Sequence, residues 1–229
     1  MSNTNLMQGD CLERMKEIKD GSVDMILTDP PYSVITGGSN LNKKGAPKGI
    51  LTNNKQLMKN IPNFNCWLNQ CYRVLKMQTH AYFMTNTKNL AFMMSAAEQA
   101  GFYIHNVLIW KKNNATPNKW YMKNGEYIIF CSKGKAKFIN NCGSKTVHEF
   151  NNPRNKIHPT EKPLKLMELY ILNSSVKGDI ILDPFMGSGS TGVAAKNLNR
   201  NFIGIELDGT YFHIAKERID LTTTQGALV

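Results

Sequence analysis

Two patterns of apolar residues alternate along the chain. Short continuous apolar runs, typical of buried strands, are separated by segments in which apolar residues recur every three or four positions, as in helices with one buried face. Strands are predicted at residues 23–28, 80–84, 103–110, 126–131, 180–183 and 201–206, with a short edge strand within 6–10. Helices are predicted at residues 11–18, 64–75, 164–175 and 208–219, from a cap at Asn86 or Thr87 to Ala100, and from about Ser190 through Leu198.

Long polar segments interrupt this pattern. Residues 33–62 are rich in Gly, Asn, Lys and Ser, which predicts a loop with a turn of helix at 56–60. A loop of this length is more typical of a lid or a substrate clamp than of a linker. Residues 111–125 and 132–160 are also basic and predicted to be irregular, and a frayed tail is expected from residue 222 onward.

Length and composition indicate a soluble globular protein. The 229 residues suffice for one sizeable α/β domain, and 41% of them are hydrophobic and 20% charged. No apolar run approaches the roughly 20 residues of a membrane helix, and the N-terminus has no signal-peptide pattern. We therefore expect no membrane association and a cytoplasmic location.

The cysteines favour a reducing compartment rather than a metal site. They are five in number and form no Cys-x-x-Cys pair. Cys66 and Cys71, together with His148 and His158, offer a conceivable metal set, but buried thiols are the favoured interpretation. The expected metal content is none.

Positive charge is concentrated in the middle of the chain. The net charge is +11, yet residues 30–160 hold eighteen Lys or Arg and three Glu, whereas both flanking segments are slightly acidic. No acidic residue lies between Asp29 and Glu98. A solvated basic face is one explanation, but so long an acid-free stretch is better explained by contact with a polyanion, which favours nucleic acid.

The segment Asp29-Pro30-Pro31-Tyr32 follows the predicted strand 23–28 and has unusual chemistry. Two prolines fix their φ angles and lack N–H groups, so the elbow presents a carboxylate and carbonyls that can only accept hydrogen bonds. Such a pocket suits an amino group with two hydrogens, and Tyr32 offers a face on which a planar ring can stack. An ordinary strand-to-loop turn is the alternative, because Asp-Pro is a common turn opener.

A second motif lies near the C-terminus. The predicted strand 180–183 ends in Asp183, a Gly-rich turn spans 184–192, and a helix follows. This arrangement is typical of nucleotide binding, because glycines permit close backbone approach and the helix N-terminus offers free N–H groups. The next strand ends in Glu206, where a partner for a ribose hydroxyl is expected. The turn matches neither a phosphate-binding P-loop nor a clean Gly-x-Gly-x-x-Gly.

Together these motifs resemble those of the S-adenosylmethionine-dependent DNA amino-methyltransferases, the N4/N6 methyltransferase family. Asp29-Pro30-Pro31-Tyr32 matches the catalytic motif, and the stretch 183–191 matches the cofactor motif. The segments 158–163 and 8–11 resemble the stretches that precede those motifs. The order, with the catalytic half first, a variable region between and the cofactor half last, is similar to the β-class.

The resemblance implies an α/β, Rossmann-like methyltransferase fold with helices on both faces of a mostly parallel seven-stranded sheet. It implies one catalytic domain over residues 1–229 with permuted motif order, in which 33–60 and 111–157 are inserted DNA-contact and target-recognition loops. S-adenosyl-L-methionine is the implied cofactor and DNA the implied partner. A homodimer and a cognate restriction enzyme are suggested by the class alone, as is a bacterial or virus-infected bacterial host.

Residue roles follow from the same resemblance. Asp29 and the Pro30 carbonyl would accept the amino hydrogens of a flipped base, Pro31 would stiffen the elbow, and Tyr32 would stack on the ring. The residues implied in cofactor binding are Asp10, Cys11, Lys162, Asp183, Phe185, Gly187, Ser188, Gly189, Ser190, Thr191 and Glu206. Among these, Asp10 would meet the adenine, Glu206 the ribose, and Lys162 the methionine carboxylate.

Asp rather than Ser at position 29 favours adenine N6 over cytosine N4 as the methylated atom. The N4-cytosine enzyme remains an alternative, and so does a DNA-binding partner subunit without activity. A nicotinamide-dependent oxidoreductase would use the Gly-rich turn but would give the basic middle region no role. An amide methylase of protein or RNA is disfavoured by Asp29 and by that basic region.

Overall fold

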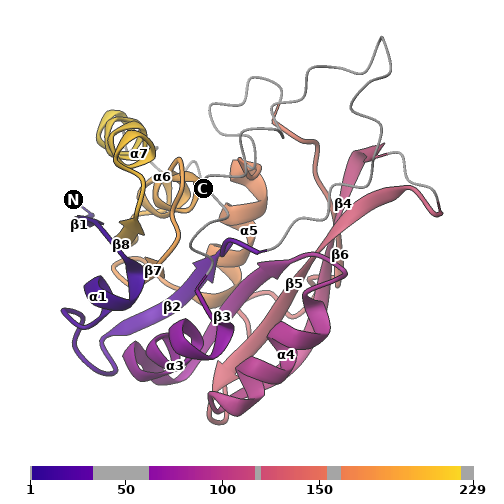
Figure 1. Cartoon of the computed structure of the whole chain (residues 1–229), viewed down its shortest axis with the longest axis horizontal. Coiled ribbons are helices and arrows are strands. Elements are labelled where there is room, and N and C mark those ends of the chain that lie inside the picture. Colours follow the sequence, from indigo (N-terminus) through magenta and orange to yellow (C-terminus); the bar gives the residue numbers. More distant parts are fainter. Residues whose placement is uncertain (1, 33–61, 117–119, 154–160, 223–229) are drawn as a thin grey trace.

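The computed structural model describes residues 2–32, 62–116, 120–153 and 161–222. Within these ranges, eight strands form one sheet in the order β1-β8-β7-β2-β3-β5-β4-β6 (Figure 1). The strands are β1 (Thr4–Gln8), β2 (Val23–Thr28), β3 (Leu75–Thr85), β4 (Phe102–Thr116), β5 (Lys123–Lys133), β6 (Val147–Glu149), β7 (Ile180–Asp183) and β8 (Asn201–Glu206). The helices are α1 (Cys11–Met15), α3 (Phe64–Val74), α4 (Leu90–Gln99), α5 (Leu164–Ser174), α6 (Ser190–Asn197) and α7 (Gly209–Leu221).

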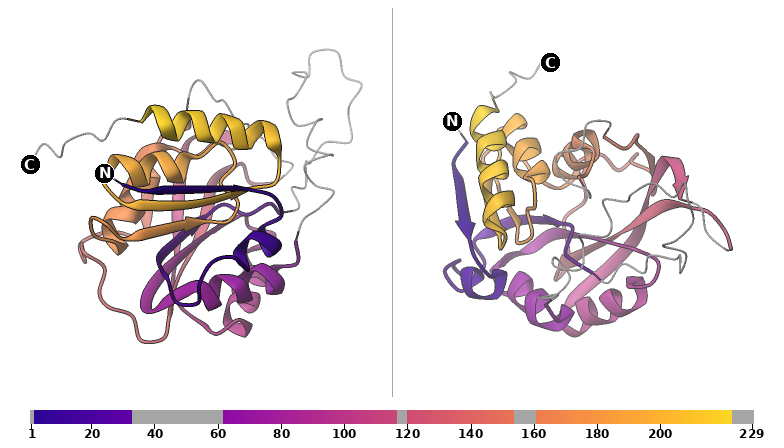
Figure 2. Two further views of the ribbon diagram at one scale, coloured as in Figure 1. Left: turned by 90° about the vertical axis from the view of Figure 1, so that its left-hand side faces the viewer. Right: turned by 45° about the horizontal axis from the view of Figure 1, so that its top comes forward.

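Helices cover both faces of the sheet (Figure 2). One hydrophobic cluster joins α1, α3 and α4 to the sheet, and a second joins α5, α6 and α7 to the opposite face. Successive strand residues divide between the two clusters: Tyr82 and Met84 pack with α5, whereas Ala81 and Phe83 pack with α3 and α4. This is the alternation expected of a strand buried on both sides.

The sheet is mostly parallel, as predicted, but it has eight strands rather than seven. Five strand pairs are parallel, and β5 alone runs antiparallel to both of its neighbours, β3 and β4. The additional strand is β6, which pairs with β4 within a region predicted to be irregular. It has only three residues, and Val147 and Glu149 are exposed, so it carries no apolar run that the sequence could reveal.

The predicted loop at 111–125 is also wrong in part. Residues 111–116 continue β4 and residues 123–125 begin β5, so the two strands form a long antiparallel hairpin that reaches beyond the sheet (Figure 1). Most of its polar side chains, apart from Lys112, are exposed, and the segment therefore lacks the hydrophobic alternation used to recognise strands. The predicted loop at 33–62 lies almost wholly outside the described residues.

Two glycines permit close packing of the C-terminal half. A Cβ atom on Gly192, in α6, would lie 2.4 Å from Ile219 Cδ1 and 2.7 Å from the ring of Phe202. A Cβ atom on Gly204, in β8, would lie 2.6 Å from the same ring. Helix α6 therefore approaches β8 and α7 more closely than any side chain at position 192 would permit.

We expect Gly192→Ala to lower the free energy of unfolding by about 1–2 kcal/mol, although alanine is the better helix former, because the core must shift to admit a methyl group. Urea denaturation measures the change. Gly125→Ala is the matched control, since a Cβ there would be 3.5 Å from its nearest neighbour, Ile109. A stable Gly192→Ala variant would contradict the close packing of α6.

Candidate active site

The two motifs meet because their strands are neighbours. Strand β2 pairs in parallel with β7, with Met25 opposite Ile181 and Ile26 opposite Leu182. Parallel strands end at the same edge of a sheet, so the elbow that follows β2 and the turn that follows β7 lie side by side. Thr28 Oγ1 donates a hydrogen bond of 2.6 Å to Asp183 Oδ1, which joins the two strand ends.

Asp183 organises the Gly-rich turn. Its buried carboxylate accepts hydrogen bonds from Thr28 Oγ1, from Thr191 Oγ1 at 2.7 Å and from the Phe185 N–H at 3.1 Å. Burial raises the pKa of Asp183 to about 6 against the opposing effect of these three donors. The carboxylate therefore connects β2, the turn and the first residues of α6.

Glu206 holds the other side of the turn. One of its oxygens accepts from the Gly187 N–H at 2.9 Å and the other from the Asp208 N–H at 2.8 Å. Burial raises the pKa of Glu206. Gly187 and Gly189 adopt φ angles of 52° and 82°, a region that other residues rarely enter, so both glycines are required by the turn itself.

The N-terminus of α6 has a hydroxyl without a hydrogen-bond partner among the described residues. Ser190 Oγ is fully buried there, directly after the left-handed Gly189. Ser188 and Thr191 are also buried. Helix N–H groups and a buried hydroxyl that lacks a partner suit the polar atoms of a bound ligand.

The elbow carries a chain of alternating charges. Lys162 Nζ bonds to Asp29 Oδ2 and lies 3.6 Å from Glu126 Oε2, while Lys112 Nζ bonds to Glu126 Oε1. Only 7% of the Lys162 side chain is exposed. The second carboxylate oxygen of Asp29, Oδ1, is buried and accepts no hydrogen bond from the described residues.

Two predicted aromatic residues belong to the elbow and to the Gly-rich turn. Tyr32 is partly buried, and its pKa is raised by burial and then by Asp29 and Glu126. Phe185 packs edge-to-face on Trp67, with ring centroids 5.4 Å apart.

Asp10 caps α1 through a hydrogen bond of 2.8 Å from the Leu12 N–H, the role that an N-cap residue ordinarily plays. Cys11 lies in the core, and burial raises the pKa of its thiol to about 12. Cofactor contacts of these two residues stay predictions.

The ammonium of Lys162 lies between two carboxylates of the protein, those of Asp29 and Glu126. Its expected contact with the methionine carboxylate of the cofactor stays a prediction. Glu126 and Lys112, its neighbours in the charge chain, belong to β5 and β4 and were not predicted as site residues. A glutamate within an apolar strand was the available signal, because an isolated charge there needs a buried partner.

A second bridge joins the segment before α5 to the Gly-rich turn. Arg218, in α7, donates to Ser188 O at 2.6 Å and to Glu161 Oε1 at 2.7 Å. Glu161 thus faces the turn while the adjacent Lys162 faces the elbow. Residues 158–160, which complete the motif that resembles the family, lie outside the described residues.

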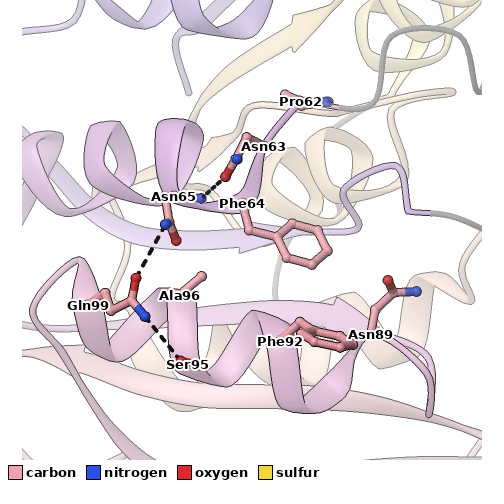
Figure 3. Close-up of a pocket in the computed structure, with 9 residues that line it drawn as sticks. All are labelled: Pro62, Asn63, Phe64, Asn65, Asn89, Phe92, Ser95, Ala96 and Gln99. Carbon is pink, nitrogen blue, oxygen red and sulfur yellow. Dashed lines mark hydrogen bonds between the residues drawn. The ribbon is translucent and has the colours of Figure 1, made fainter.

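A separate groove lies between α3 and α4. It has a volume of about 600 Å³ and is lined mainly by amide side chains and by Phe64 and Phe92 (Figure 3). None of the residues predicted for catalysis or cofactor binding lines it. Within the described ranges, no cluster of three or more His, Cys, Asp or Glu could hold a metal ion, and no helix is long and apolar enough to span a bilayer.

This fold and pair of motifs define a class of enzyme, the S-adenosylmethionine-dependent DNA amino-methyltransferases. Residues 23–217 match the N6/N4 methyltransferase family, described as DNA methylase. The chain belongs to this family.

Similar proteins agree with that assignment. The chain is 31% identical to the type II methyltransferase M.HinfI of Haemophilus influenzae over 93% of this chain and 67% of that protein. It is 32% identical to M2.LlaDCHI of Lactococcus lactis subsp. cremoris over 98% and 92% of the two chains.

The fold is shared with solved methyltransferases. A complex of M1.HpyAVI with S-adenosylmethionine (SAM) matches with a TM-score of 0.73 and 30% identity, over 94% of this chain and 99% of that one. The PvuII methyltransferase, named as cytosine-N4-specific, matches with a TM-score of 0.76 over 100% and 89% of the two chains. Its identity of 17% supports the fold alone.

The raised pKa of Asp183 gives a pH-dependent stability. The folded protein binds a proton at this carboxyl more tightly than the unfolded chain does. The protonated carboxyl therefore contributes to the free energy of unfolding at low pH, and this stabilisation is lost as pH rises through about 6. We expect the free energy of unfolding of the wild type, relative to Asp183→Asn, to fall by about 1.4 kcal/mol between pH 5 and 8.

Urea denaturation at several pH values measures this difference. Asp220→Asn, an exposed carboxylate on α7, is the matched control. A difference between wild type and Asp183→Asn that is constant or rises with pH would contradict the assignment.

Proposed function

We propose that this enzyme transfers the methyl group of S-adenosylmethionine to the exocyclic N6 of adenine in a specific DNA sequence. The observation that carries the proposal is Asp29: one carboxylate oxygen is held by Lys162, and the other is buried with no hydrogen bond from the described residues. A buried acceptor without a donor is costly, and an incoming amino group would supply one.

The described residues fit the cofactor. Glu206 and the turn from Gly187 to Thr191 would hold it, with Ser190 Oγ and the N–H groups of α6 available to its polar atoms. Phe185 offers an aromatic face beside the turn. When bound, S-adenosylmethionine supplies an electrophilic methyl group, and the protein contributes position and a dry environment.

The elbow would orient the base. Asp29 Oδ1 and the Pro30 carbonyl accept the two amino hydrogens, which discourages conjugation of the nitrogen lone pair with the ring and directs it toward the methyl group. Tyr32 stacks on the ring after the base leaves the duplex, at a cost of roughly a few kcal/mol. Pro31 fixes the geometry because its ring restricts both its own φ and the conformation of Pro30.

Adenine is the favoured base because position 29 is an aspartate rather than a serine. Cytosine N4 carries a similar amino group, so N4-cytosine methylation is the alternative. Digestion of the methylated DNA to nucleosides and mass spectrometry separate N6-methyldeoxyadenosine from N4-methyldeoxycytidine. A homodimer and a cognate restriction enzyme remain predictions from the class.

The hairpin of β4 and β5 is proposed to contact DNA. Beyond the sheet it exposes Trp120, Tyr121 and Met122, which are followed directly in sequence by the exposed Lys123. Exposed aromatic rings among basic side chains suit stacking on bases and attraction of phosphates. These residues lie within the predicted DNA-contact region 111–157; the other predicted region, 33–60, lies outside the described residues.

We expect Asp29→Ala to abolish methyl transfer to DNA, because the amino group loses its anionic acceptor, while binding of S-adenosylmethionine stays measurable. Transfer of labelled methyl groups and calorimetry measure the two properties. Asp220→Ala is the control, since the exposed carboxylate of Asp220 pairs with Lys216 on α7. Transfer by Asp29→Ala at the wild-type rate would refute the role of the elbow.

We expect the double variant Trp120→Ala/Tyr121→Ala to raise the dissociation constant for DNA about tenfold or more, since stacking contributes roughly 1–3 kcal/mol per base. Fluorescence anisotropy with labelled duplexes measures it, with cofactor affinity as the internal reference. Tyr103→Ala, an exposed aromatic at the opposite end of β4, is the matched control. Unchanged DNA affinity would exclude the hairpin from the interface.

A further inference from the structure

The charge chain at the elbow joins parts of the fold that lie far apart in sequence. Asp29 follows β2, Lys162 precedes α5, Glu126 lies in β5 and Lys112 in β4. The ammonium of Lys162 lies between the two carboxylates, and Lys112 engages the outer oxygen of Glu126. Ions alternate in sign along the chain, so every charge has an opposite neighbour.

Burial of these side chains makes the alternation of positive and negative charges necessary. Lys162 is buried, and the side chains of Asp29 and Glu126 are about one-fifth exposed. A charge so poorly solvated is retained only beside an opposite charge. Without Lys162, the two carboxylates would face each other, and the less costly response would be protonation of one of them.

Lys162 also determines which oxygen of Asp29 is available. It occupies Oδ2, and Oδ1 stays buried without a hydrogen bond from the described residues. Rotation of the carboxylate would break the ion pair, so the free lone pairs point in one direction. An acceptor whose charge and direction are both fixed in advance is what positioning of an amino group requires.

We propose that Lys162 is a positioning residue for methyl transfer, which keeps Asp29 ionised and its Oδ1 directed at the target amino group, and that Glu126, anchored by Lys112, sets the location of the ammonium. The proposal rests on the methyltransferase function proposed above. It replaces the expectation that Lys162 binds the methionine carboxylate of the cofactor.

The proposal determines the direction of two pH effects. The charged or titratable groups that act on or near Asp29 are Lys162, Glu126, Lys112, Asp183 and Tyr32. Burial raises the pKa of Asp29, Lys162 and Lys112 lower it, and Glu126 raises it. Removal of the Lys162 charge should therefore raise this pKa, and removal of the Glu126 charge should lower it.

The test compares Lys162→Met, Lys162→Arg and Glu126→Gln with the wild type in the pH dependence of kcat/KM, in kcat at pH 7.5 and in affinity for S-adenosylmethionine without DNA. We expect Lys162→Met to lower kcat at least tenfold and to move the acid limb to higher pH, with cofactor affinity within threefold of wild type. Lys162→Arg should restore part of the rate, and Glu126→Gln should move the acid limb to lower pH.

Lys165→Met is the matched control, because Lys165 is exposed on α5 and pairs with Glu168. It should leave both the rate and the acid limb unchanged. Cofactor binding by each variant reports that the cofactor half is folded, and if Lys162→Met fails to fold, Glu126→Gln still tests the sign of the pH shift.

Two results would overturn the proposal. One is a Lys162→Met enzyme with weakened cofactor affinity and an unmoved acid limb, which would show that Lys162 binds the cofactor instead. The other is a Glu126→Gln acid limb that is unmoved or lies at higher pH. A wild-type protein that transfers no methyl group to DNA would instead refute the proposed function.

Discussion

The hydrogen bond from Thr28 to Asp183 is the contact on which the rest of the site depends. It joins the ends of two parallel strands that are separated by more than 150 residues of sequence but are adjacent in the sheet. The same carboxylate receives Thr191 and the Phe185 N–H, so one buried group positions the elbow, the Gly-rich turn and the start of α6. The raised pKa of Asp183 indicates that this arrangement costs stability at neutral pH.

The buried carboxylates in the two halves of the site have different kinds of hydrogen-bond donor. In the half proposed to bind the cofactor, Asp183 and Glu206 are held by neutral donors, namely backbone N–H groups and hydroxyls. In the half proposed to be catalytic, Asp29 is held by an ammonium. Under the proposed mechanism, neutral donors would hold the turn in shape without opposing the approach of a positively charged sulfonium, whereas the ammonium at the elbow would keep an electron-rich acceptor ionised.

Much of this arrangement could be predicted from the sequence, for identifiable reasons. The strand that precedes Asp29 and the strands that end in Asp183 and Glu206 are short apolar runs, which the sequence pattern predicts directly. The polar hairpin beyond Trp110 and the three-residue β6 were not predicted, because their stability comes from strand pairing rather than from an apolar face. The ion-pair partners of Lys162 were not predicted, because an ion pair between distant segments leaves no local sequence pattern. The family resemblance implied a ligand as the partner of Lys162 rather than carboxylates of the protein itself.

Adjacent residues Glu161 and Lys162 diverge to opposite sides of the site, one to Arg218 beside the cofactor turn and the other to Asp29. The number of residues between this pair and α5 therefore decides which side chain faces which partner. Deletion of one residue between Lys162 and the helix would shift both side chains and bring a carboxylate toward Asp29, where two negative charges would repel each other. The order of Glu161 and Lys162 relative to α5 is therefore a constraint on the length of this connection, because each of the two residues must reach its own partner.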